Sequence, residues 1–172
     1  MDDLLAAMND AHYHSAINNN NVSSAVIMQM ALVGKAFPES VAAALLTLGD
    51  VHGPTAQARH AIYYATTDEI ENDIEEDLII PGFGNAFYKD SIDPAWAQFD
   101  MRLRAEFPDV AREIDRIADM ISYYKKKKIY PNPAAFTATV AELQGAPLGT
   151  EISLLITARM PAWVELWAMN QR

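Results

Sequence analysis

Apolar residues along the chain fall into runs that proline and glycine separate. Residues 25–33 are apolar on most helical faces and stop at Gly34, and residues 41–48 follow Pro38 in the same manner. A serine pair can cap the first run, and proline suits the first turn of a helix. The pattern predicts two helices joined by a short link at residues 35–37. Because neither helix has a polar face, we expect the hairpin to be buried in a core or a subunit interface.

The rest of the chain carries the same helical punctuation. Asp93-Pro94 and Pro133 mark helix starts, and Pro108 separates two runs whose apolar residues recur at helical spacing. Pro161 is expected to break or kink the last run into a pair of helices. No alternating pattern persists long enough to build a sheet, so the predicted fold class is all-α. The further helices are predicted over residues 54–65, 94–107, 110–121, 133–143 and 151–170.

Two charged segments are interpreted as solvent-exposed. Residues 68–77 hold seven carboxylates in ten positions, which suits a solvated helix face or loop. A metal site is the less favoured alternative, because nothing in the segment fixes a ligand geometry. The four lysines at 125–128 suit the C-terminal end of a helix. The net charge of −10 would repel a polyanion, so no nucleic-acid partner is expected.

The composition narrows the class of protein further. The chain has 172 residues, 51% of them hydrophobic and none of them cysteine. A core can therefore form, while disulfides, thiolate catalysis and cysteine-based zinc sites are excluded. The acidic start at residues 1–3 lacks the basic region of a signal peptide, and the apolar stretch 22–33 is too short to cross a bilayer. We expect a cytoplasmic protein that has no membrane contact.

Residue types suited to catalysis are few. No two histidines have the i, i+4 spacing of a metal-binding helix, so no metal site is predicted. The chain has neither a nucleophile elbow nor a Walker-type phosphate loop. Gly82-Phe83-Gly84 follows the apolar residues 78–80 and by itself indicates only an extended segment that enters a tight loop. The histidines are His12, His14, His52 and His60.

Four separated motifs lie in a fixed order along the chain. They are His14 with NVSSA at 21–25, GDVHG at 49–53, IPGFGNAFYK at 80–89 with Asp93-Pro94, and IYPN at 129–132 with Ala158-Arg159 and Trp163. Together they resemble the C-terminal part of the citrate synthase family. The resemblance extends from about residue 12 to residue 167. One motif alone would be weak, but four in order are specific.

The resemblance implies a helical fold with a buried hairpin and a small helical lobe. Residues 1–66 and 146–172 would form large-domain-like core helices, and residues 67–145 the small-domain-like lobe. In the family, a carboxylate removes an α proton from an acyl-CoA thioester while histidines polarise the reacting oxygens. CoA would be a co-substrate, with no other cofactor and no metal. The hairpin at 25–48 resembles the family's dimer interface, which implies a homodimer.

The resemblance also gives roles to residues of this chain. His52 matches the enol-stabilising histidine, and His14 matches the histidine that contacts the oxo acid. Arg159 matches a carboxylate-binding arginine, a role that suits its planar fork of donors. The loop Pro81-Gly82-Phe83-Gly84 matches the segment whose backbone receives the adenine end of CoA. Lys89 is a looser match, placed near the CoA phosphates.

Three positions depart from the family pattern. Asn85 stands where a second catalytic histidine is usual, and asparagine can donate a hydrogen bond but cannot deliver a proton. Ala95 replaces a carboxylate-binding arginine, and Ala134 replaces the catalytic aspartate. A base, an acid and an anchor are thus altered together. Asp93, Asp90 or a residue of a second subunit would have to replace the lost carboxylate.

Three functions follow from this combination. The leading prediction is an acyltransferase-type enzyme that makes or breaks a carbon–carbon bond between an acyl-CoA and a 2-oxo acid, because His52, the glycine loop and Arg159 are retained. The second is a catalytically inactive homologue that binds CoA or a carboxylate in a regulatory role. The third is one subunit of a split enzyme, in which another polypeptide supplies the N-terminal helices of a full-length family member.

Overall fold

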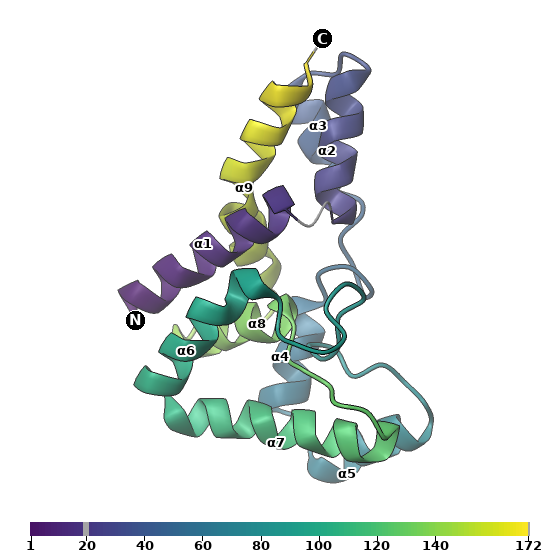
Figure 1. The fold of residues 1–172 in the computed structure, drawn as a ribbon, viewed down its shortest axis with the longest axis vertical. Helices are drawn as coiled ribbons and strands as arrows, with labels where there is room; N and C mark the ends of the chain where they lie inside the picture. The colour runs from purple at the N-terminus through teal and green to yellow at the C-terminus, as the bar shows by residue number, and fades with distance from the viewer. Residues whose placement is uncertain (19–20, 172) are drawn as a thin grey trace.

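The computed structural model describes residues 1–18 and 21–171, which form helices joined by loops (Figure 1). Within these residues the only β pairing is one isolated antiparallel bridge, between Phe83 and Pro131, so the all-α prediction is confirmed. None of the helices among the described residues combines the length and the hydropathy that a membrane span needs. The elements are α1 Asp2–Asn18, α2 Val22–Leu32, α3 Phe37–Leu45, α4 Thr55–Tyr63, α5 Thr67–Glu75, the 3-10 helix η1 Pro94–Trp96, α6 Ala97–Glu106, α7 Pro108–Lys125, α8 Pro133–Leu143 and α9 Glu151–Asn170.

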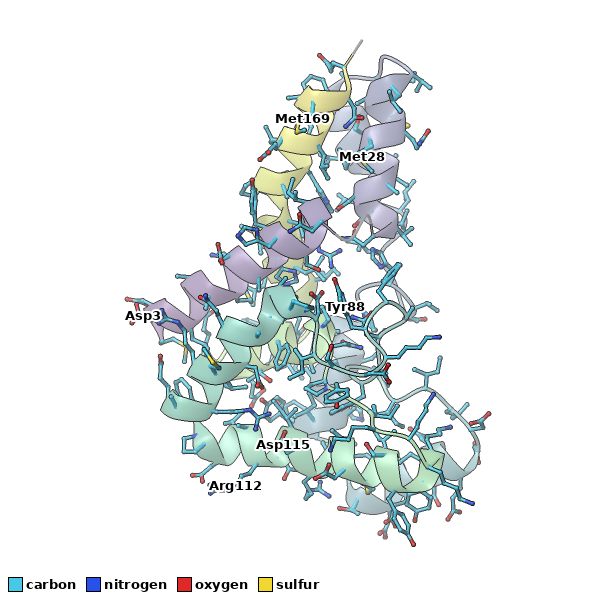
Figure 2. The ribbon with its side chains drawn as sticks, in the orientation of Figure 1. Asp3, Met28, Tyr88, Arg112, Asp115 and Met169 are labelled. Atoms are coloured by element: carbon cyan, nitrogen blue, oxygen red, sulfur yellow. The ribbon has the colours of Figure 1, made fainter. Side chains whose placement is uncertain are left out.

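The helices form two groups at opposite ends of the molecule (Figure 1). At one end α2 and α3 pack against α9, and at the other lie α4 to α8. α1 packs on α9 and also contacts α6 and α8, so it links the groups. Figure 2 shows Met28 and Met169 at the first end and Arg112 and Asp115 at the second. The division into residues 1–66 with 146–172 and a lobe at 67–145 stays a prediction.

The main hydrophobic core lies between α1, α6, α7 and α8. Trp96 and Phe99 are fully buried and pack on Phe136, with ring centroids 5.4 and 5.1 Å away. Aromatic side chains remove the most apolar area from water, so they dominate the stability of such a core. His12 contacts Trp96 edge-on and hydrogen-bonds Thr137 at 2.8 Å. This buried histidine therefore belongs to the core.

The predicted α2–α3 hairpin is confirmed, with different ends. Asn21 caps α2 instead of Ser23 or Ser24, because its side-chain oxygen accepts the backbone N–H of Ser24 at 3.2 Å. α3 ends at Leu45, before the glycine that was expected to end it. The hairpin is held to α9 by a second, smaller core. Its fully buried members are Ile27, Ala44 and Trp163, with Leu166 nearly so.

The two long terminal helices differ from the prediction. The sequence pattern does not predict α1, although Leu4 and Met8 lie one turn apart and are fully buried. The predicted break at Pro161 is wrong, because one helix, α9, continues through it over the predicted range 151–170. Proline removes one intrahelical hydrogen bond. Trp163 lies two residues later in the second core, and this packing keeps the chain helical across the proline.

The acidic segment forms α5, and the prediction of a solvated face is confirmed. Thr66 and Glu69 make a capping box at its start, and Ile70 and Ile74 are its buried residues. Most of the carboxylates face solvent, and the described residues contain no cluster of three side chains suited to a metal ion. At the end of α7, two of the four lysines pair with surface carboxylates, as expected for a solvated helix end.

Candidate active-site pocket

A pocket of about 210 Å³ lies between the loop after α3, the loop before η1, the start of α8 and the side of α9. His52, Gly84, Asn85 and Arg159 all line it, although they are far apart in the sequence. Pockets for drug-sized ligands usually measure roughly 300–1,000 Å³. This one therefore suits a small acid, or the acyl end of a thioester, and not a whole CoA molecule.

Backbone pairing fixes the glycine loop against the start of α8. The N–H of Gly84 donates to the carbonyl of Tyr130 at 2.8 Å, and the N–H of Asn132 donates to the carbonyl of Gly82 at 2.9 Å. The Asn132 amide donates to the Gly84 carbonyl at 2.8 Å, while its side-chain oxygen caps α8 through the N–H of Ala134. One asparagine thus joins two walls of the pocket.

The residues of the glycine loop differ in whether they pack inside the protein or line the pocket. Gly82 has φ of +93°, and a Cβ there would lie 3.1 and 3.2 Å from two alanine side chains, so packing requires glycine. Phe83 is buried in the main core. Gly84 has φ of +82° with open space around it and lines the pocket, whereas Pro81 lines a separate one. Only the last residue of the predicted CoA-binding loop therefore meets the pocket.

Arg159 is a buried cation that pairs with no carboxylate of the described residues. Its side chain comes from α9 and is 5% exposed, and its Nη1 donates to the Ser23 hydroxyl at 3.2 Å. Its Nε is buried without a hydrogen-bond partner, and no carboxylate of the described residues lies within ion-pair distance. Burial lowers the pKa of Arg159 to about 10, so it stays charged at neutral pH. Such an arrangement is costly unless an anion completes it.

His52 is held beside this guanidinium by a shared hydroxyl. Its Nε2 lies 3.3 Å from the Oγ of Ser23, the same atom that accepts from Arg159. Burial, and then the Arg159 charge, lower the pKa of His52 to about 4. The imidazole is therefore neutral at neutral pH. Ser23 in turn donates to the side-chain oxygen of Asn21 at 2.9 Å.

Asp93 and Asn85 supply further polar groups. Asp93 is 4% exposed, and among the described lining residues it is the one carboxylate. It caps η1 by accepting the N–H of Ala95 at 3.0 Å and also accepts the Ser15 hydroxyl at 3.3 Å. The side-chain oxygen of Asn85 accepts two backbone N–H groups of the following turn, at 2.8 and 3.3 Å. Its amide nitrogen is the donor that remains for a ligand.

Two predicted site residues lie outside the pocket. His14 is half-exposed, with Nε2 3.5 Å from a carboxylate oxygen of Asp10, and lines a neighbouring pocket of about 360 Å³. Asp93 lines both pockets and so separates them. Lys89 is exposed and lines neither. The structure thus brings His52, Asn85 and Arg159 together but does not add His14 or Lys89.

Two positions at which the sequence departs from the expected family pattern lie in adjoining pockets. Ala134 lines the pocket at the first turn of α8, and Ala95 lines the neighbouring pocket beside His14. A methyl group offers neither a base nor an anchor. Sequence reasoning assigned no site role to Asn21 or Ser23. The available signal is that these polar residues open a helix that is otherwise almost entirely apolar.

Comparison with known proteins identifies the group to which this fold and pocket belong. The family model for the citrate synthase C-terminal domain matches residues 4–171, and the chain belongs to the citrate synthase family. Curated protein sequences include no match to the chain. Several solved structures share the fold at low sequence identity, which shows the architecture alone.

Three of these structures are longer than this chain, each by a different amount. Citryl-CoA lyase from Hydrogenobacter thermophilus is similar with a TM-score of 0.77 and 23% identity, over 98% of this chain and 70% of that one. Citrate synthase from Thermotoga maritima MSB8 gives 0.74 and 23%, over 94% and 48%. ATP citrate lyase from Methanothrix soehngenii, in complex with citrate and coenzyme A, gives 0.73 and 15%, over 98% and 31%. The chain therefore spans about half of the citrate synthase and a third of the ATP citrate lyase.

Proposed function

We propose that this protein binds a small 2-oxo acid together with the acyl end of a CoA thioester, and that it makes or breaks the carbon–carbon bond between them. The observation that carries the proposal is the buried guanidinium of Arg159, which lines the pocket without a carboxylate partner among the described residues. A carboxylate ligand would supply the missing charge through the planar donor fork. Membership of the citrate synthase family supports the same chemistry.

The other lining groups suit the acyl end of the reaction. The amide nitrogen of Asn85 is a donor for an oxygen on which charge develops, and His52 lines the same pocket as a neutral imidazole. Gly84 leaves room for backbone contact with the pantetheine arm of CoA, and the exposed Lys89 is free to reach phosphates at the surface. CoA acts as a co-substrate in this account, and no metal takes part.

Ala134 limits the expected rate of condensation, because it stands at the position of the family's catalytic aspartate. A positioned side chain that transfers a proton contributes about 100- to 10,000-fold to a rate. With Ala134 in the base position, condensation is expected to be slow unless another group of the pocket takes the proton. Cleavage of a preformed 3-hydroxy-acyl thioester begins instead with removal of a hydroxyl proton, which is more acidic than the α proton of a thioester, and it ends with protonation of the enolate carbon after the carbon–carbon bond has broken.

The experiment is a test in both directions. The purified protein is incubated with acetyl-CoA and oxaloacetate, with citryl-CoA, and with other acyl-CoA and oxo-acid pairs, while products are followed by mass spectrometry. Turnover with one pair is expected, and it should be lost in Arg159→Met but kept in Arg104→Met, a surface control. Folded protein that turns over none of the pairs would contradict the enzymatic proposal.

A second candidate function is binding without turnover. The observation that favours it is the combined replacement of base, acid and anchor by Ala134, Asn85 and Ala95. Calorimetry with CoA and with di- and tricarboxylates should then give binding while every pair above gives no product. If binding appears only after a second polypeptide from the source organism is added, the split-enzyme alternative is favoured instead.

We also propose that the protein is a homodimer that forms through residues 25–48. Several apolar side chains at the ends of the α2–α3 hairpin face solvent in the single chain: Val22, Val33 and Leu46 are 54%, 69% and 88% exposed. Exposed apolar surface of this kind favours a partner surface. Light scattering should give the mass of two chains at micromolar concentration, and the mass of one chain would contradict the proposal.

A further inference from the structure

The hydrogen bonds around Ser23 decide which nitrogen of His52 carries the proton. The starting point is the backbone N–H of Ser24, which is always a donor and which points at the Asn21 side chain at 3.2 Å. The Asn21 atom in that position must therefore be its oxygen, an acceptor. Because the Ser23 hydroxyl also contacts this oxygen, at 2.9 Å, the single hydroxyl proton of Ser23 is committed to Asn21.

The remaining partners of Ser23 then have fixed roles. A hydroxyl has one proton and two acceptor lone pairs. The Nη1 of Arg159 is always a donor and occupies one lone pair at 3.2 Å. His52 Nε2 contacts the same oxygen at 3.3 Å, so it must donate its own proton to the second lone pair. The neutral imidazole is the Nε2–H tautomer, and its Nδ1 is an unprotonated acceptor.

Nδ1 of His52 is available to a ligand. This atom has no hydrogen-bond partner among the described residues and is not fully buried. The His52 side chain lines the pocket. Ala134, at the usual position of the family's carboxylate, lines the same pocket. The imidazole whose Nδ1 lone pair is unused thus shares one pocket with the position at which a carboxylate base is missing.

We propose that His52 Nδ1 is the proton acceptor of this site and carries the proton between carbon and oxygen during the reaction. The proposal rests on the proposed function and replaces the expected role of His52, because the neutral imidazole has no second proton to donate to an enol. Ser23 is a positioning residue in this account, because it sets the tautomer without touching the reacting atoms. Arg159 remains the anchor for the carboxylate.

Nδ1 of His52 alone can carry out both proton transfers of the reaction. In cleavage, Nδ1 takes the hydroxyl proton of a 3-hydroxy-acyl thioester, the carbon–carbon bond breaks, and its electron pair becomes a thioester enolate beside the released 2-oxo acid. The new imidazolium then returns the proton to the enolate carbon, which gives the acyl thioester. Condensation is the same sequence reversed, so no additional acid, base or hydrolysis step is needed.

The basicity of His52 fits the task. The pKa of His52 is lowered to about 4 by burial and then by the Arg159 charge, so the lone pair is available at neutral pH. An ordinary aspartate has a pKa of about 3.9. The imidazole therefore has about the basicity of the carboxylate that Ala134 lacks. Asp93 is the competing base, but both of its oxygens already accept hydrogen bonds, from Ala95 and Ser15.

The tautomer is measured directly, without any ligand. In protein labelled with ¹⁵N-histidine, correlation spectra at pH 7 show which ring nitrogen carries the proton, and His52→Gln assigns the signal. A proton on Nε2 alone is expected, and Ser23→Ala should give a mixture of both tautomers. A proton on Nδ1 in the unchanged protein would overturn the inference, whether or not the proposed function holds.

The proton transfer is measured by exchange of acyl α-hydrogens for deuterium, with acetyl-CoA in D₂O. His52→Gln keeps a donor toward Ser23 but has no basic nitrogen, so exchange should fall about 100- to 10,000-fold. His60→Gln, on the exposed face of α4, should leave it unchanged. In the unchanged protein, the rate should fall as the pH drops through about 4.

Three outcomes of this exchange experiment are decisive. If Asp93→Asn abolishes exchange while His52→Gln does not, Asp93 is the base and the inference is wrong. If CoA or oxo acid binds by calorimetry but the unchanged protein gives no exchange, the inference is wrong while a binding function stands. If neither ligand binds, the proposed function itself fails.

Discussion

Two arginines are buried among the residues that the structure describes, and their surroundings are opposite. Arg59 of α4 is 3% exposed and donates to Glu142 at 2.7 Å and to Glu151 at 2.6 Å. Burial alone would lower the pKa of Arg59, but these two carboxylates outweigh it and raise the pKa. Arg159 of α9 is 5% exposed, meets one hydroxyl, and has a pKa lowered to about 10 by burial.

The difference separates a structural charge from a binding charge. Arg59 joins α4 to α8 and α9, and its carboxylate partners belong to the same chain. Arg159 has the same desolvation cost without the compensation, and it lines a pocket instead of a packed interface. Where a fold keeps an unpaired buried cation, the counter-charge is expected from outside the chain. Replacing each arginine with methionine tests whether the two charges differ in this way.

The largest effect is expected when Arg59 is replaced. Arg59→Met leaves the carboxylate of Glu151, which is fully buried, without its partner. Removing one member of a buried ion pair typically costs about 3–5 kcal/mol in the free energy of unfolding. Urea titration followed by circular dichroism measures this cost. A loss below about 1 kcal/mol would mean that the Arg59 cluster is no more structural than a surface pair.

A smaller effect is expected from pH, and it concerns the histidine beside Arg159. The pKa of His52 is about 4 in the folded protein and 6.5 ordinarily, so between these values the unfolded chain binds a proton that the folded protein does not. The free energy of unfolding should therefore fall as pH drops from 6.5 to 4 and should not change for this reason above 6.5. Because His52 is only partly buried, we expect about 1–2 kcal/mol.

Urea titrations at pH 7 and pH 4.5 measure this loss in the unchanged protein and in His52→Gln. The variant should lose less stability on acidification, because it has no imidazole to protonate at this position. Buried His12, whose pKa is lowered well below its ordinary value by burial and then by Arg159, acts in the same direction in both proteins. Equal losses in the two proteins would show that His52 does not titrate as described.

The smallest effect on stability is expected from the pocket arginine itself. Arg159→Met removes an uncompensated buried charge and replaces it with an apolar side chain of similar length, so the free energy of unfolding should stay the same or rise. The variant breaks one hydrogen bond, to Ser23, which is worth about 1 kcal/mol. A loss of 3 kcal/mol or more by urea titration would make Arg159 a structural residue like Arg59.

Local signals explain which parts of the fold the sequence predicts. Proline predicts the starts of α4 and α8 to within one residue, because its fixed φ suits the first turn of a helix. Pro161 misleads for the opposite reason: packing of α9 against distant helices outweighs a local break. α1 carries a buried stripe at helical spacing but has no proline or glycine at its ends to mark it.

Part of the candidate site can likewise be predicted from sequence motifs, and the rest depends on how the helices pack. Motif order places His52, Asn85 and Arg159 together, and the structure puts all three in one pocket. It cannot reveal that Gly82 is needed for packing, or that His14 faces a neighbouring pocket, because both depend on how α8 and η1 pack. The hydrogen bonds of Ser23 can likewise be seen only in the structure, because they join α2, the loop after α3 and α9.

The most direct test of the account is calorimetric titration of oxaloacetate into the unchanged protein and into Arg159→Met. Binding to the unchanged protein is predicted, with a loss of about 2–5 kcal/mol in the variant, because truncating one partner of a buried charge pair costs that much. Arg104→Met should bind as the unchanged protein does, since Arg104 pairs with Asp100 and Asp115 on the surface. Equal binding in all three proteins, or binding in none, would contradict the claim that Arg159 keeps its charge for a carboxylate ligand.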